Sequence, residues 1–302
     1  MPARSRRSRR LLETIDMIFE TKQEILDRYE SQPRTLTDEF IAGIPWDKVA
    51  DHPIDDRLVP VLLYMRDVET LTDMYHRELR RTPTGRDPVI SKFMERWGVE
   101  EVTHGEVLNR FLNEIGISTD ERWQSQIRRS VSTVYNVNTF FITSLTNLLG
   151  SSFTATHMTF GAIHEMTAAQ SYRRLMELAD HPVLTIILKA IIREESAHTK
   201  FYWSVARLEL QRNSFARKLA RSVINNFWYP VGQGSIPKKK TEYTVSTLFG
   251  FDGGLELFDK TVTSRVRQLP GFDDLTKTTE KIKRICQENI PRENFLGASV
   301  RA

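Results

Sequence analysis

Two short motifs of identical spacing each combine a carboxylate with an imidazole. Glu-x-x-His occurs at Glu101–His104 and at Glu195–His198, and nowhere else in the 302-residue sequence. On an α-helix, residues three positions apart lie on one face, so both side chains of a motif can reach the same point. Mixed oxygen and nitrogen donors are typical ligands of first-row transition metals. The two motifs therefore predict a metal site.

Two further glutamates extend this pattern to a complete ligand set. Glu69 and Glu165 lie about 30 residues before Glu101 and Glu195, a spacing that fits one helical hairpin each. The longer separation between Glu101 and Glu165 fits a crossover connection. Four glutamates and two histidines on four helices are the ligands of a carboxylate-bridged dinuclear metal site. We predict these six residues as metal ligands and catalytic residues: Glu69, Glu101, His104, Glu165, Glu195 and His198.

The donor types also restrict the metal. Four carboxylates balance the charge of two divalent cations, and oxygen with imidazole donors favours iron or manganese over a thiolate-type site. We expect two iron ions, with an Fe/Mn or Mn/Mn pair as alternatives. A metal pair of this kind supplies O2 chemistry, so O2 is the expected co-substrate.

Apolar residues with helical periodicity predict the elements that carry these residues. We expect helices over 11–31, 58–81, 88–115, 126–149, 153–178, 182–211 and 213–228, and two shorter ones within 243–288 separated by Pro270-Gly271. No strand is expected. The predicted fold is all-α, a ferritin-like four-helix bundle with additional flanking helices. We expect one domain, in which residues 1–57 form a basic tail, a helix and a lead-in, 58–229 the di-metal bundle, and 230–302 a C-terminal loop and helices that pack on it.

Composition limits the other classes of function. The net charge is +4, and five of the first ten residues are arginine, so the basic character is concentrated in a tail. Basic residues are not spread over a face with interleaved aromatics, so we expect no nucleic-acid partner. No apolar run approaches the length of a membrane span. The single cysteine, Cys286, excludes an intrachain disulfide and fits a reducing compartment, so we expect a cytoplasmic protein.

The remaining histidines lack this pattern. Asp73 and His76 follow Glu69 on a similar helical face, and we interpret them as supporting or helix-end groups. His164 is adjacent to Glu165 but about 100° around the helix, so ligation is not expected. His52, His157 and His181 have no partner pattern, and we expect them to be structural or exposed.

Several stretches resemble motifs of the soluble acyl-acyl-carrier-protein desaturases, most closely the bacterial and mycobacterial branch. Residues 97–112 resemble the family's Trp-x-x-Glu-Glu-x-x-His-Gly-x-x-Leu-x-x-Tyr-Leu stretch. Glu69 with residues 75–78 resembles the first-ligand helix, and residues 195–202 resemble the last-ligand helix. Residues 268–272 are similar to the family's late Leu-Pro turn. The resemblance covers about 40–290.

The resemblance implies a role for each predicted ligand. Glu101 and Glu195 take the positions of the bridging carboxylates, and the other four take those of terminal ligands. It further implies a di-iron desaturase of lipid biosynthesis, with electrons from ferredoxin, a fatty acyl chain on acyl-carrier protein and a homodimer. Because acyl-carrier proteins are acidic, a basic docking surface is expected. Its candidate residues are Arg217, Lys218, Arg221, Lys238, Lys239 and Lys240.

Some positions depart from the family pattern and leave the reaction open. Plant members have arginine just before each ligand histidine, where this chain has Thr103 and Ala197. A plant threonine associated with activated oxygen is Ala168 here. Desaturation, hydroxylation or another oxidation therefore remain alternatives. An arylamine N-oxygenase would have a seventh ligand histidine at Ile191, which counts against that class, and a non-catalytic metal-binding ferritin-like protein is a third alternative.

Overall fold

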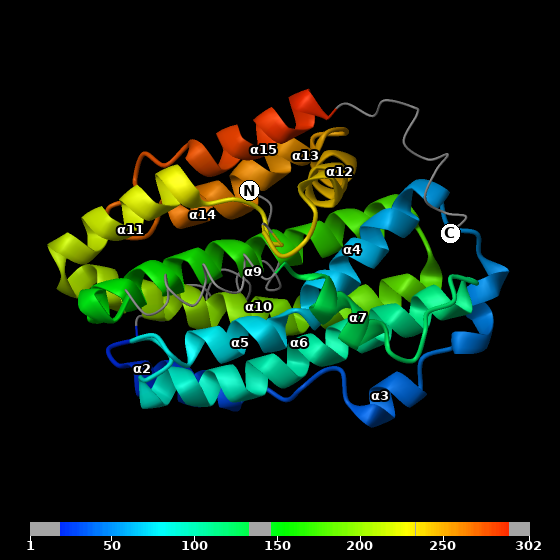
Figure 1. The fold of residues 1–302 in the computed structure, drawn as a ribbon, viewed down its shortest axis with the longest axis horizontal. Helices are drawn as coiled ribbons and strands as arrows, with labels where there is room; N and C mark the ends of the chain where they lie inside the picture. The colour runs from blue at the N-terminus through cyan, green and yellow to red at the C-terminus, as the bar shows by residue number, and fades with distance from the viewer. Residues whose placement is uncertain (1–18, 133–145, 233, 290–302) are drawn as a thin grey trace, which may run out of the picture.

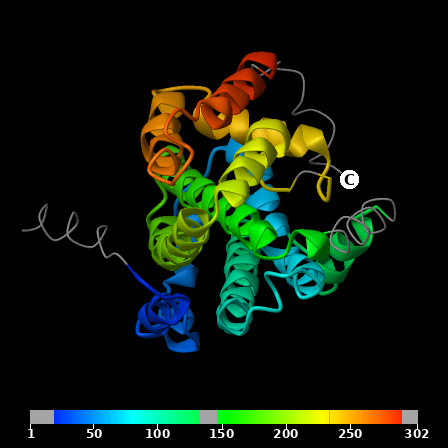
Figure 2. The same ribbon diagram turned by 90° about the vertical axis from the view of Figure 1, so that its left-hand side faces the viewer.

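Four long helical segments form the centre of the molecule. The computed structural model describes residues 19–132, 146–232 and 234–289, and every regular element in these ranges is helical. The segments are α4 (Val59–Thr70) with α5 (Thr72–Leu79), α6 (Pro88–Glu114), α9 (Ser151–Ala179) and α10 (Pro182–Arg212). Helix α4 packs against α6, α9 packs along α10, and α6 contacts α10, as Figures 1 and 2 show. The predicted all-α class is confirmed.

Local capping fixes where the two motif helices begin. Asp87 accepts hydrogen bonds from the first amides of α6, and His181 accepts one from an amide of α10. In both helices proline follows the cap, at a position where no amide hydrogen is needed. The rings of Phe93 on α6 and Phe201 on α10 stack with centroids 3.7 Å apart, which fixes the contact between the two helices.

The expected helix over 58–81 is interrupted directly after its candidate ligand. Helix α4 ends at Thr70, and α5 starts at Thr72. The Thr70 hydroxyl donates to the Arg66 carbonyl four residues earlier, a bond that tends to bend helices. Glu69 therefore lies in the last turn of α4, facing the bundle interior.

Two flanking helices differ from the prediction. Helix α2 (Lys22–Glu30) is capped by Thr21, so residues 19–21 are not helical, and residues 11–18 lie outside the described residues. Helix α7 (Trp123–Ser130) ends at Val131, whose backbone is extended, so the prediction of one helix over 126–149 is wrong there. Residues 133–145 lie outside the described residues, and Thr146–Leu149 form a 3-10 turn.

The C-terminal helices cover one side of the bundle (Figure 2). They are α11 (Ser214–Phe227), α12 (Lys238–Phe249), α13 (Gly254–Phe258), a π turn (Asp259–Thr263), α14 (Ser264–Val266) and α15 (Lys277–Glu288). Helix α11 packs on α9, while α12 contacts both α4 and α9. The expected break at Pro270-Gly271 is present, where Gly271 has φ +87°. Helix α12 begins five residues earlier than expected, after Pro237.

Short helical pieces connect α2 to α4. They are α3 (Asp38–Ala42), η1 (Trp46–Asp51) and η2 (Asp56–Leu58), within a stretch expected to be irregular. Among the described residues, no helix combines the length and apolar character needed to cross a membrane.

Candidate metal centre

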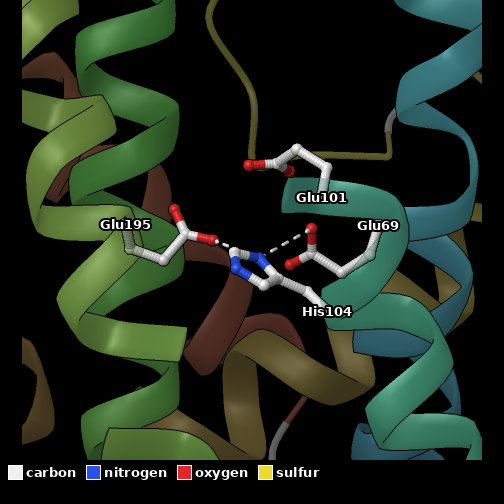
Figure 3. Close-up of side chains that lie close together, drawn as sticks. All are labelled: Glu69, Glu101, His104 and Glu195. Carbon is white, nitrogen blue, oxygen red and sulfur yellow. Dashed lines mark ion pairs between the residues drawn. The ribbon is translucent and has the colours of Figure 1, made fainter. Parts of the chain in front are cut away.

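The six predicted residues lie together as two overlapping clusters. The first contains Glu69, Glu101, His104 and Glu195, and the second contains Glu101, Glu165, Glu195 and His198. Within each cluster, one ligand atom from every member lies within 4.8 Å of the others. All six side chains are buried. Figure 3 shows the first cluster, with Glu195 facing His104, Glu69 and Glu101 across the bundle interior.

Two carboxylates belong to both clusters. Glu101 from α6 and Glu195 from α10 are shared, while Glu69 and Glu165 each belong to one. A carboxylate has two oxygens, so a shared glutamate can contact two neighbouring ions at once. The positions of Glu101 and Glu195 therefore suit the bridging role that the desaturase resemblance implied, and this role stays a prediction.

Each histidine is oriented by a glutamate from the other motif. His104 Nε2 lies 2.9 Å from Glu194 Oε2, and His198 Nε2 lies 2.8 Å from Glu100 Oε2. An imidazole that donates through Nε2 presents Nδ1 on its opposite side. His104 Nδ1 lies 3.2 Å from an oxygen of Glu195, and His198 Nδ1 lies 3.1 Å from an oxygen of Glu101. Both Nδ1 atoms therefore face the carboxylate clusters.

The two supporting glutamates are themselves held. Glu194 accepts from the backbone amides of Thr35, at 2.5 Å, and Leu36, at 3.0 Å. Glu100 accepts from the hydroxyl of Tyr29, at 2.5 Å, and from the guanidinium of Arg96, at 2.8 Å. These hydrogen bonds stabilise the ionised carboxylates. Burial opposes ionisation of Glu100, but the hydrogen bond and charge of His198, followed by the hydrogen bonds of Tyr29 and Arg96, lower its pKa to about 2.

Sequence reasoning did not predict Glu100 and Glu194 as site residues. Each directly precedes a predicted ligand, so each motif in full is Glu-Glu-x-x-His. Neighbouring helical residues point about 100° apart, so a residue beside a ligand does not share its face. The pair of adjacent glutamates in both motifs was the one sequence feature that could have indicated these supporting residues. Tyr172, whose hydroxyl donates to Glu69, carried no such signal.

Several atoms of the clusters have no hydrogen-bond partner. They are one oxygen of Glu101, both carboxylate oxygens of Glu195, and Nδ1 of His104 and of His198, all buried. Buried polar atoms of this kind are costly unless a cation or a proton satisfies them. All five are chemically suited to coordinate first-row metal ions. The residues present therefore fit a pair of bound ions.

The clusters retain protons when no cation is bound. Burial, together with the charges of Glu69 and Glu195, raises the pKa of Glu101 well above its ordinary value. Burial and the charge of Glu195 raise the pKa of Glu165 to about 8. Burial alone would lower the pKa of His104 and His198, but the surrounding carboxylates outweigh it and raise both well above the ordinary value. Metal ions would replace these protons.

A cavity of about 430 Å³ adjoins the clusters. Its wall includes Glu69, Glu101, Glu165 and Glu195, so all four carboxylates border it. The remaining wall is contributed mainly by α4, α5, α9 and α12 and is predominantly apolar. A mostly apolar space that reaches buried carboxylates is suited to bind a small molecule next to them.

The remaining histidines lie outside both clusters. His164 Nε2 is 3.1 Å from the Tyr229 carbonyl, and His181 caps α10, as a structural role requires. Asp73 and His76 were predicted to be supporting or helix-end groups. Asp73 forms ion pairs with Arg77 and Arg128 and belongs to neither cluster.

Comparisons with protein-family models, curated proteins and solved structures find no match.

Proposed function

We propose that the chain is an oxidoreductase that binds two metal ions, iron in the simplest case, and uses O2 to oxidise a largely apolar substrate. We also propose that its four central segments form a ferritin-like bundle. One observation carries the functional proposal: the four carboxylates that form the two clusters also line the cavity. Ions bound there would contact a molecule in the cavity directly.

Each ion would have its own pair of ligands. Glu69 and His104 belong to one site, Glu165 and His198 to the other, and Glu101 and Glu195 to both. When bound, an iron pair supplies electrons to O2 and an oxidant for carbon–hydrogen bonds.

The chain itself orients the candidate ligands and excludes water from the cavity. Glu194 and Glu100 hold the Nε2 protons of the two histidines and thereby fix their rings. Tyr172 donates to Glu69 and limits its rotation. The apolar wall of the cavity keeps bulk water from the reacting carbon.

For the substrate, we propose a fatty acyl chain carried on acyl-carrier protein, with desaturation as the reaction and ferredoxin as the electron donor. The resemblance of the ligand motifs and the apolar cavity support this. Hydroxylation of the same chain is the nearest alternative, since Ala168 on the cavity wall replaces the threonine of the plant enzymes.

The candidate docking surface has weaker support. Arg221 pairs with Asp274, Arg217 donates to the carbonyl of Leu210, and Lys238 pairs with a glutamate on α12. These cations stabilise the C-terminal helices, and such a role needs no carrier protein.

Two other classes fit the structure less well. The position that would carry a seventh ligand histidine in an N-oxygenase is Ile191, which is fully buried in the core. A storage protein needs no substrate space, whereas a cavity of about 430 Å³ adjoins these clusters.

The test is reconstitution with iron, ferredoxin, O2 and acyl-carrier-protein thioesters, followed by mass spectrometry of the acyl chain. Loss of two hydrogens identifies desaturation, and gain of one oxygen identifies hydroxylation. Stoichiometric iron uptake without any O2-dependent product would support the storage class and refute the proposal.

A further inference from the structure

The cavity has two chemically different sides. Met65 lies one turn before Glu69 on α4, and it lines the cavity with Leu248 and Phe249 of α12. On this side, Thr244 is the single residue, among those described, with an unpartnered buried hydroxyl in the wall. This side therefore suits hydrocarbon.

The other side of the cavity lies beyond the clusters, at the end of the cavity away from Met65. It is formed by residues one or two helical turns from the predicted ligands. Trp97 lies four residues before Glu101 on α6, and Tyr202 lies four residues after His198 on α10. His157 lies two turns before Glu165 on α9, which packs along α10. All three residues line the cavity. One helical turn is about 5 Å, so Trp97 and Tyr202 lie roughly that far along the bundle from the clusters.

Tyr202 contacts both of the other side chains. The ring of Tyr202 meets that of Trp97 at 6.0 Å and that of His157 at 6.3 Å between centroids, edge to face in both cases. Gly161 makes this arrangement possible, because a Cβ atom at that position would lie 2.4 Å from the Tyr202 ring. Tyr202 therefore lies flat against α9 in the wall of the cavity.

Their hydrogen-bonding groups are unused. Trp97 Nε1 and His157 Nδ1 are buried without a partner, and the Tyr202 hydroxyl forms no hydrogen bond within the described part of the chain. Two other polar groups of the wall are occupied: Tyr64 donates to the Val231 carbonyl, and His164 bonds to a backbone carbonyl. Unused donors and acceptors gathered in one wall of an apolar cavity indicate a ligand with a polar group there.

The charge of the wall limits this polar group. No lysine or arginine lines the cavity among the residues that the structure describes. Outside the clusters, the wall has one carboxylate, Glu78, and it is paired with Arg81. Burial lowers the pKa of His157 to about 4, so its imidazole is neutral at pH 7. Beside Trp97, His157 and Tyr202, an anionic group would be buried without a cation, which is strongly unfavourable.

We propose that the cavity binds an uncharged amphipathic molecule whose hydroxyl or carbonyl oxygen contacts Trp97, His157 and Tyr202. Its hydrocarbon part lies toward Met65, Leu248 and Phe249. The metal clusters lie between the two sides, so the oxidised carbon is about one helical turn from the oxygen. The position of the oxidised carbon rests on the proposed function, whereas the orientation of the ligand's oxygen and hydrocarbon parts in the cavity does not.

The test compares three ligands of similar shape: 2-naphthol, naphthalene and 2-naphthoate. Each is titrated, by its own fluorescence, into the full chain loaded with redox-inert Zn²⁺ and into the metal-free chain. Tyr202→Phe and Trp97→Phe should each weaken 2-naphthol binding about three- to tenfold, the loss of one hydrogen bond, and change naphthalene affinity less than about twofold. In the metal-free chain, where no ion can coordinate a carboxylate, 2-naphthoate should bind at least about tenfold more weakly than 2-naphthol.

Tyr64→Phe is the matched control. It makes the same chemical change in the same cavity, but its hydroxyl is already bonded to Val231, so it should not alter the preference between 2-naphthol and naphthalene. Unchanged naphthalene binding also shows that a variant is folded. Parallel losses for both neutral ligands, or equal affinity for naphthol and naphthoate in the metal-free chain, would overturn the inference. Retained naphthol preference without any O2-dependent turnover would refute the proposed function alone.

Discussion

His198 hydrogen-bonds through Nε2 to Glu100, at 2.8 Å, and thereby directs Nδ1 toward Glu101, at 3.1 Å. His104 forms the corresponding bond to Glu194. Each motif thus supplies two candidate ligands and, from the preceding residue, the support for the histidine of the other motif. The two candidate metal sites are therefore coupled through the helices that carry them.

This coupling predicts the effect of neutralising the supports. Glu100→Gln or Glu194→Gln keeps the size of the side chain but removes the charge that orients the histidine. We expect metal affinity, measured by competition with a chelator, to fall about 10- to 100-fold in each variant. Glu106→Gln, an exposed change on the same α6, should have no effect. Unchanged affinity in both support variants would show that these glutamates do not orient the ligands.

The raised pKa values predict that metal uptake releases protons. Glu165, with a pKa of about 8, and Glu101, His104 and His198, whose pKa values are also raised, hold protons near pH 7 that metal ions must displace. Metal affinity should therefore increase as the pH rises from 6.5 to 8. Calorimetry in buffers of different ionisation enthalpy measures the release. Uptake without proton release would contradict the assignment.

The same groups predict how the metal-free protein responds to pH. A group whose pKa is raised on folding stabilises the folded state below its unfolded pKa, and this stabilisation is lost as pH rises through the folded value. From about pH 7.5 to 8.5, above the pKa of about 6.5 of an unfolded histidine, His157 and His164 are largely neutral in both states, and the stability of the metal-free chain should fall as Glu165 ionises. Urea unfolding in a chelator measures this. Glu165→Gln should reduce the slope, and a stability that rises over this range would contradict the prediction.

Two glycine positions in the central helices predict opposite effects on stability. Gly161→Ala places a Cβ 2.4 Å from the Tyr202 ring, so we expect a loss of about 1–3 kcal/mol. Gly98→Ala, where the nearest atom would be 3.6 Å away, should stabilise the chain by about 0.5–1 kcal/mol because alanine favours helix. The free energy of unfolding in urea distinguishes them. Equal effects would show that Tyr202 is not fixed by this contact.

The sequence was most informative where helical periodicity and ligand spacing coincide. The bounds of α6, α9 and α10 match their predictions within two residues, because capping residues and glycine or proline mark the helix ends. The break after Glu69 and the end of α7 at Val131 were not predicted, because they depend on backbone contacts that a pattern of apolar residues does not show.

The supporting residues were hidden for a different reason. Glu100 and Glu194 act across the bundle on histidines of another helix, and a single helix face does not show that relation. The cavity likewise depends on how α12 packs against α4 and α9, which no local motif predicts.

Metal content per chain, determined by elemental analysis of four variants, tests the central claim most directly. The unmodified protein should hold about two iron or manganese ions. Glu69→Ala and Glu165→Ala each remove a ligand of one cluster and should leave about one ion per chain. His198→Ala also removes a ligand of one cluster and should leave one ion at most. Glu101→Ala removes a ligand shared by both clusters and should leave no bound ion. Two ions retained in both Glu101→Ala and His198→Ala would contradict the proposed metal centre.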